Sequence, residues 1–183
     1  DNLLSRGLGD VYKRQEWYTL FQYGKLNDIQ SQFFKPKSPE SLYNIEEDPH
    51  ETKNLANDIA YNDVLIAMRE NLNNHLMSIN DLSFLPEPYF LKKGIDDVME
   101  YSTQNKALIK QLIETSNLQL KDYDAVSSQI KKALDHDNPW VRYWGLIVCS
   151  SFGSKAMENK EKINMIFEND SENLVRMRAA EFM

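Results

Sequence analysis

Apolar residues recur at helical spacing along most of the chain, and one proline-rich stretch interrupts them. Over 16–24 the apolar side chains follow the helical period, and Gly24 stands where a left-handed cap ends a helix. A second short amphipathic helix is expected over 26–34. Pro36 and Pro39 then exclude a helix, because each lacks a backbone donor and biases the preceding residue toward extended geometry.

The segment after these prolines has the composition of a strand followed by a turn. Residues 42–45 read Leu-Tyr-Asn-Ile and favour a short strand, and the acidic turn 46–49 ends it. A further helix is predicted to begin at the N-cap candidate Asp58. Its apolar positions share one face and are Val64, Leu65, Met68, Leu72, Leu76 and Ile79.

The last part of the chain repeats itself. Val141-Arg142 and Val175-Arg176 are offset by 34 residues, and each pair follows an amphipathic helix and an acid-rich turn. This pattern resembles HEAT-like repeats, in which stacked helix pairs bury one face against their neighbours. Two copies carry the signal.

Smaller features of the sequence are consistent with the repeat. Gly145 of the first copy lines up with Ala179 of the second, which suits close helix contact. Helical patterns around 98–101 and 107–113 are consistent with an earlier, less regular unit. We therefore expect a mainly α chain: a small α+β subdomain over 16–93, followed by a fragment of a HEAT-like α-solenoid over 94–183.

Composition narrows the possible functions. The chain has 183 residues, 42% of them hydrophobic, which is enough to build a packed core. A net charge of −7 argues against a nucleic-acid binder, which needs a concentrated basic face. The longest apolar stretch, 145–149, is far shorter than the roughly 20 residues of a membrane-spanning helix. The single cysteine excludes an internal disulfide.

One motif is more specific than anything else in the sequence. Residues 42–56 read LYNIEEDPHETKNLA, and this run resembles the pattern ELYDLxxDPxExxNLA near the C-terminus of type I sulfatases. Asn44 stands where the family usually has Asp. Residues 84–87, Phe-Leu-Pro-Glu, match the LPE that ends this region in similar sulfatases, so the resemblance extends from about residue 16 to about residue 87. The motif positions Asp48, Pro49, Asn54 and Leu55 are expected to be structural.

The resemblance is to the branch related to N-sulfoglucosamine sulfohydrolase, and it implies a parent enzyme that hydrolyses sulfate esters or N-sulfates of sugars. The family uses a formylglycine, made from Cys or Ser in a C/S-x-P-x-R motif, and a Ca²⁺ ion held by Asp and Asn. Neither motif occurs here. The resemblance thus implies a non-catalytic fragment that needs no cofactor of its own. Its expected partner is its own missing N-terminal domain, and the parent protein is expected to be periplasmic or extracellular. A sulfated glycan or a protein is expected on the repeats.

Two alternatives to this fragment stay open. In the first, the chain is a non-enzymatic helical-repeat scaffold whose sulfatase-like motif is coincidental. In the second, it belongs to a sulfatase-derived protein that has lost catalysis and only binds.

Few residues offer chemistry. His50 lies within the motif and is a candidate to approach a sulfated substrate, because this region borders the active-site cleft in similar sulfatases; the alternative is an ordinary turn residue. Cys149 has no proline or arginine at the required offsets and is expected to be a buried thiol. His75 and His136 have no acidic residues at ligand spacing, so no metal site is expected.

The repeated arginines Arg142 and Arg176 are expected to be structural. A guanidinium can satisfy several carboxylates or carbonyls of an acidic turn at once, and Asp135, Asp137 and Asp170 are the natural partners.

Other side chains are weaker candidates for a sugar site. Trp140 and Trp144 share a helical face with Tyr143 beside them, which suits either a platform for a sugar ring or core packing. Two lysine pairs are candidates to attract a sulfated polymer, although surface lysines are usually only solvating: Lys35 with Lys37, and Lys92 with Lys93.

The start of the chain needs separate treatment. Residues 10–15 read Asp-Val-Tyr-Lys-Arg-Gln, which resembles the translation of a transposon mosaic end used in sequencing libraries. We therefore interpret 1–15 as adapter-derived and exclude it from the fold argument. The alternative is a basic, flexible N-terminal loop.

Overall fold

The computed structural model describes residues 3–183, which form a mainly helical chain without a β-strand. The chain divides into two compact units, Asp1–Ala56 and Asn57–Met183. The sequence analysis predicted a boundary at a later position, between residues 93 and 94.

The first unit begins with a single long helix, α1 (Leu3–Gln22). Residues 3–15 are therefore helical rather than a loop, while their adapter origin stays a prediction. As expected, Gly24 caps the end of this helix in the left-handed region, with a φ of +63°, and the amide of Lys25 donates to the carbonyl of Leu20 at 2.9 Å. A capping box between Asn27 and Gln30 then starts the short α2 (Asp28–Ser31), which continues into η1 (Gln32–Phe34).

The strand predicted over 42–45 is wrong. Residues 42–44 have no regular structure, and Ile45 begins a turn in which the carbonyl of Asn44 accepts from the amides of Glu47 and Asp48. Leu42 contacts the other end of the same loop, because its carbonyl accepts from the amide of Leu55 at 2.8 Å. A β-ladder needs a run of backbone partners on a neighbouring strand, and no described residue supplies one.

The first long helix of the second unit is α3 (Asn62–Ile79). Asp58 is an N-cap, as predicted, but it caps the short η2 (Ile59–Tyr61) and not α3 itself, by accepting from the amide of Ala60 at 3.0 Å. The apolar face predicted on this helix is only partly covered. Leu65 is buried and Leu76 is half-buried. The remaining predicted members are exposed: Val64, Met68, Leu72 and Ile79.

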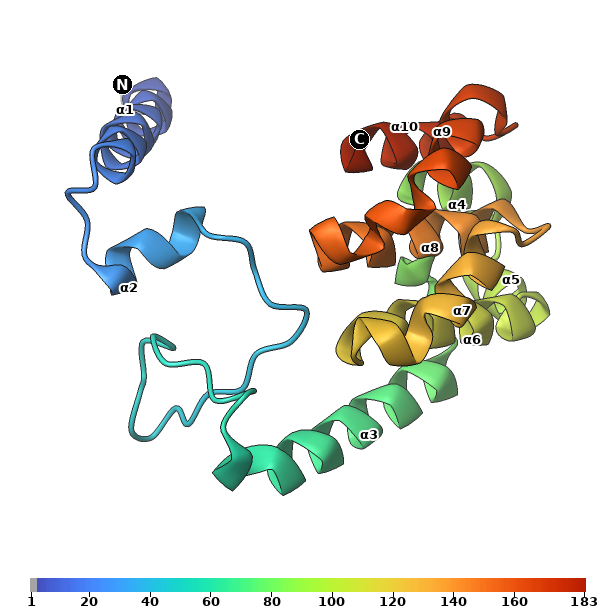
Figure 1. Cartoon of the computed structure of the whole chain (residues 1–183), viewed down its shortest axis with the longest axis horizontal. Coiled ribbons are helices and arrows are strands. Elements are labelled where there is room, and N and C mark those ends of the chain that lie inside the picture. Colours follow the sequence, from blue (N-terminus) through green and yellow to red (C-terminus); the bar gives the residue numbers. More distant parts are fainter. Residues whose placement is uncertain (1–2) are drawn as a thin grey trace. The chain divides into compact units, whose positions relative to one another are not determined.

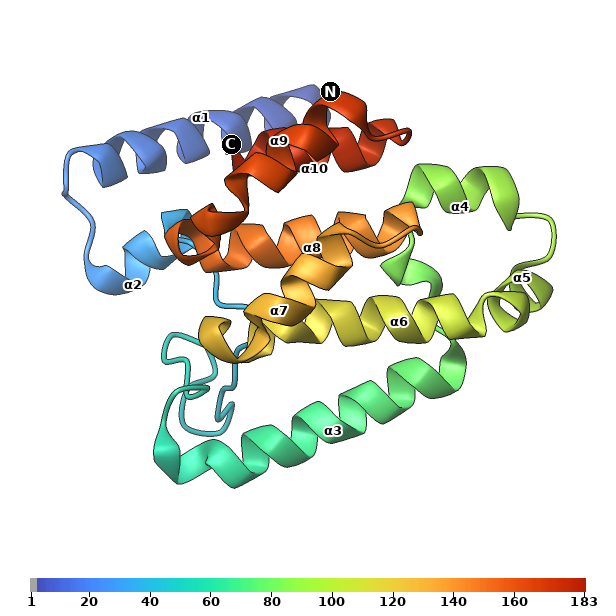
Figure 2. The ribbon, with the colours of Figure 1, turned by 45° about the vertical axis from the view of Figure 1, so that its right-hand side comes forward.

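The remaining helices form a stack (Figures 1 and 2). They are η3 (Leu82–Phe84), α4 (Glu87–Lys93), α5 (Val98–Gln104), α6 (Lys106–Ser116), η4 (Asn117–Leu120), α7 (Tyr123–Leu134), α8 (Pro139–Phe152), η5 (Gly153–Asn159), α9 (Lys160–Asn169) and α10 (Asn173–Phe182). In this stack α3 contacts α6, both α6 and α7 contact α8, and α10 contacts α8 and α9.

The core lies between these helices and uses the repeated positions. Val141 and Val175, which the sequence aligns, are both buried, as are Leu146 and Ile163. Helices α7 and α8 approach closely at Gly145, where an added Cβ would lie 3.1 Å from the Cβ of Ala133. This spacing explains a small residue there, because an additional side-chain atom would have to displace the neighbouring helix.

Candidate functional site

The sulfatase-like motif folds into a loop that is organised by Asp48. One carboxylate oxygen of Asp48 accepts from the backbone amides of Thr52 and Lys53 at 2.7 and 2.8 Å, and the other accepts from the Thr52 hydroxyl at 3.0 Å. The amide of Lys53 and the groups of Thr52 together hold the pKa of Asp48 below its ordinary value, because they stabilise the charged form. Asp48 therefore determines how the chain turns.

Asn54 closes the same loop. Its side-chain oxygen accepts from the amides of Leu42 and Ala56, both at 3.0 Å, and its side-chain nitrogen donates to the carbonyl of Glu40 at 3.4 Å. Leu42 and Leu55 are buried at the point where the two ends meet. The Asn and Leu of the motif thus join its beginning to its end.

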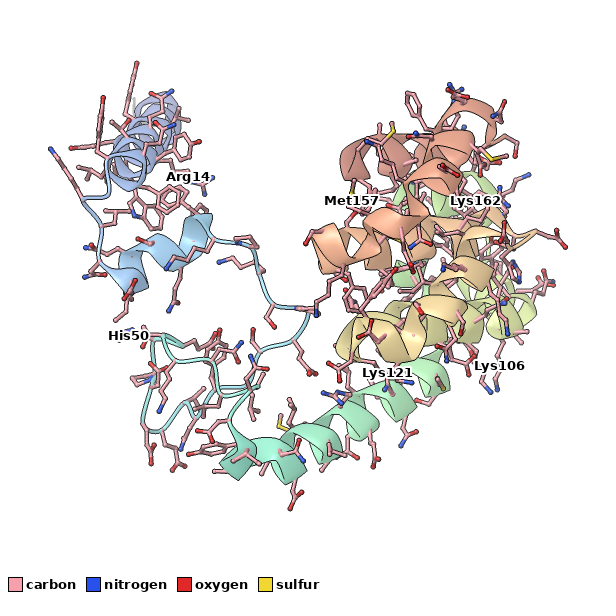
Figure 3. The ribbon with its side chains drawn as sticks, in the orientation of Figure 1. Arg14, His50, Lys106, Lys121, Met157 and Lys162 are labelled. Carbon is pink, nitrogen blue, oxygen red and sulfur yellow. The ribbon has the colours of Figure 1, made fainter. Side chains whose placement is uncertain are left out.

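His50 lies at the exposed tip of this loop and is labelled in Figure 3. Pro49 precedes it, and Glu51, which follows, has a φ of +52°. A non-glycine residue in the left-handed region carries local strain. The hydrogen bonds from the amides of Thr52 and Lys53 to Asp48 span Glu51 and maintain this conformation. The loop therefore presents His50 to solvent, and its role toward a substrate stays a prediction.

Arg142 connects two turns of the helical stack. It donates to both carboxylate oxygens of Asp170, from Nε at 2.7 Å and from Nη2 at 2.9 Å, and its Nη1 donates to the carbonyls of His136 and Asp137. The Asp170 side chain is only 3% exposed and that of Arg142 only 15%. Asp135 pairs with Lys162 instead.

Arg176, the residue aligned with Arg142, makes a simpler contact. Its Nε donates to the carbonyl of Phe167 at 2.8 Å. The two arginines, which the sequence aligns, thus differ in their partners.

Trp140 and Trp144, for which the sequence left open either a sugar platform or core packing, both pack against other aromatic rings. Trp140 is 2% exposed and packs against Tyr89 at 4.5 Å between ring centroids, so it belongs to the core. Trp144 is half-buried; its indole N–H donates to the carbonyl of Phe84 at 2.7 Å, and the two rings lie 5.3 Å apart. These contacts explain the two tryptophans through packing.

The remaining candidates make ordinary contacts. Burial raises the pKa of the Cys149 thiol to about 12, which keeps it protonated and unreactive. Lys35 pairs with Asp28 at 3.5 Å, and Lys37 donates to the carbonyl of Gln32 at 2.9 Å. Lys92 and Lys93 are exposed in the last turn of α4, and His75 is exposed on α3. Within 3–183, no three His, Cys, Asp or Glu side chains come together as metal ligands.

The sequence did not indicate a second polar cluster, between α7 and η5. The hydroxyl of Tyr123 donates to Glu158 at 2.7 Å and accepts from the buried Asn159 at 3.1 Å, while Lys131 pairs with Glu158 at 3.2 Å. Burial raises the pKa of Tyr123 to about 12, and the hydrogen bond from Tyr123 lowers that of Glu158. No local sequence motif could predict this cluster, because its members lie about 30 residues apart in the sequence.

The sequence also gave no sign of a pocket of about 580 Å³ lined by α3, α6, η4 and α7. Its walls carry amides and lysines from separate parts of the chain, and Figure 3 labels one of them, Lys121, which directly follows η4 and precedes α7. A polar residue on each of several helices leaves no short pattern in a sequence.

One stretch of the chain is similar to a known enzyme. Over 80 residues, which are 43% of this chain, it is 40% identical to the ulvan-active sulfatase of Formosa agariphila. This chain therefore contains a sulfatase-related region. The matched stretch covers only 13% of that relative. No protein-family model matches the chain, and no solved structure matches it.

The helices within 3–183 include none that is both long and apolar enough to cross a bilayer.

Proposed function

We propose that this chain is the C-terminal, non-catalytic part of a formylglycine-dependent sulfatase, followed by HEAT-like repeats. The 40% identity to a sulfatase over 80 residues carries this proposal. The hydrogen bonds of Asp48 and Asn54 support it, because they give the motif residues a structural reason to occur together. The parent protein would hydrolyse sulfate esters or N-sulfates of sugars.

The calcium ion and formylglycine of such an enzyme do not fit the residues of this chain. Both oxygens of Asp48 are already occupied by hydrogen bonds, and no group of three potential ligands forms among the described residues. The sole thiol, Cys149, is buried in the repeat core. Catalysis would therefore reside in the missing N-terminal domain, and this chain would support it.

The exposed apolar residues of α3 form the surface through which this chain would contact the catalytic domain. Val64, Met68 and Leu72 are four residues apart, so they line one face, and all three are exposed. An uncovered apolar stripe is typical of a contact surface. Because the matched relative is far longer than the matched stretch, we assign this face to the catalytic domain of the same protein.

A second candidate function rests on the helical stack. The bidentate bond between Arg142 and Asp170 ties neighbouring helix pairs together, as a solenoid requires. In this alternative the chain is a binding scaffold without a catalytic partner.

The upstream reading frame separates the two functions. We would amplify the gene outward from the codons for 16–183 in the DNA from which the sequence came. The first proposal predicts a C/S-x-P-x-R motif and acidic calcium ligands upstream. A frame that lacks both would refute it and leave the scaffold.

A further inference from the structure

The pocket between α3, α6 and α7 has the composition of a saccharide site. Its floor is apolar, formed by the buried Leu118, Ala133 and Val141. Its walls are polar, and its volume of about 580 Å³ is within the range of small-molecule sites. An apolar floor suits the C–H face of a sugar ring, while polar walls suit its hydroxyl groups.

The hydrogen bonds within the pocket determine which groups remain for a ligand. The side chain of Asn117 donates to the side-chain oxygen of Asn73 at 3.0 Å, which leaves the Asn73 nitrogen as a donor. The Nδ1 of His136 accepts from the amide of Asn138 at 2.9 Å, so the ring proton lies on Nε2. That nitrogen is 2.9 Å from the side-chain amide of Gln111, which must present its oxygen there and turn its NH₂ group away from the ring.

The charge of the pocket favours an anion. Lys121 and Lys132 line it, both are exposed, and neither forms an ion pair within the described part of the chain. Among the described residues that line it, Glu114 is the only one with a carboxylate, which lies 3.8 Å from the ammonium group of Lys110. A concentration of unpaired lysines is notable in a chain whose net charge is −7.

We propose that this pocket binds a sulfated saccharide. The two ammonium groups would hold the sulfate, because ammonium groups form strong charge-assisted hydrogen bonds to oxyanions. The amides of Asn73 and Gln111 would bind ring hydroxyls, and the floor would contact the ring. The choice of sulfate over other anions rests on the proposed function, whereas the saccharide character rests on the pocket itself.

The test uses the whole chain and isothermal titration at physiological salt. The ligand is a sulfated carrageenan tetrasaccharide, with its desulfated counterpart and sodium sulfate as controls. Lys121→Gln and Lys132→Gln should each weaken binding about three- to fivefold, which is the upper part of the range measured for an exposed ion pair. Lys106→Gln removes the same charge at the start of α6, outside the pocket, and should change affinity less than about twofold because salt screens distant charges.

Several results would overturn the inference. The first is that the sulfated compound does not bind. The second is that the desulfated compound or sodium sulfate binds with equal affinity. The third is that Lys106→Gln weakens binding as much as Lys121→Gln and Lys132→Gln do. Circular dichroism would verify that each variant is folded, since all three lysines are exposed. The outcome is independent of the upstream reading frame, so failure of the pocket and failure of the sulfatase assignment are distinguishable.

Discussion

Arg142 holds Asp170 through two parallel hydrogen bonds, although the two residues are 28 positions apart in the chain. The same guanidinium satisfies two carbonyls of the turn before its own helix. One side chain thus fixes the turn between α7 and α8 against the turn between α9 and α10.

Removal of Arg142 should destabilise the second unit strongly. Arg142→Ala leaves the carboxylate of Asp170 buried without its partner, which costs about 3 kcal/mol for a broken buried pair. The melting temperature should fall by roughly 10 °C in a unit of this size. Differential scanning calorimetry measures this directly.

Arg176→Ala is the matched control for that experiment. It removes a single hydrogen bond to a carbonyl, worth about 1 kcal/mol. Equal losses in the two variants, or an unchanged melting temperature in Arg142→Ala, would contradict the role assigned to Arg142.

Asn54→Ala should loosen the motif loop without unfolding the stack. The change leaves the amides of Leu42 and Ala56 without their acceptor, at a cost of about 1 kcal/mol for each lost bond. Hydrogen exchange of the Leu42 and Leu55 amides should accelerate about tenfold or more. Asn57→Ala, for which no hydrogen bond is seen, should leave both rates unchanged; acceleration there too would refute the role of Asn54.

The stability of the loop should depend on the charge of Asp48. Its pKa is lowered in the folded state, chiefly by the amide of Lys53, so the stabilisation is complete above the unfolded pKa of about 3.9. It is lost as pH falls through the lower, folded pKa. A carbon-detected NMR titration should place the midpoint of Asp48 below its ordinary value, and Asp48→Asn should abolish this part of the acid dependence. A midpoint at or above the ordinary value would contradict the hydrogen bonds described.

Cys149 should not react with thiol reagents in the folded protein. It is fully buried, and its pKa is raised to about 12, so thiolate is scarce at pH 8. Ellman's reagent should label it only after urea is added. In a Cys149→Ala background, Met157→Cys provides an exposed thiol that reacts at once (Figure 3). Rapid labelling of Cys149 in the native protein would show that the core is open.

The parts of the fold that follow from local patterns could be predicted from the sequence. Helical spacing predicted the helices at Val98–Gln104 and Lys106–Ser116, and the offset of the two Val-Arg pairs located two buried valines. The prediction of a strand over 42–45 failed because a strand depends on a partner strand, and none forms among residues 3–183. The face of α3 was predicted as a whole, although only Leu65 on it is buried, because periodicity cannot tell which part of a stripe meets another helix.

The candidate site was harder to predict. The motif predicted Asp48 and Asn54 as structural residues, but their hydrogen bonds link backbone groups up to 14 positions away. The pocket could not be predicted at all, because Asn73, Gln111 and Lys132 meet only through the packing of three helices. Residue types on separate helices acquire a common function only once the helix order is known.

The most direct measurement of the central claim is sulfate release. The full-length gene product, matured by the formylglycine-generating enzyme, and the present chain would be incubated separately with a sulfated oligosaccharide, and free sulfate would be quantified by ion chromatography. We predict release by the full-length protein and none by this chain. Release by this chain alone, or none by the full-length protein, would contradict its assignment as the non-catalytic part of a sulfatase.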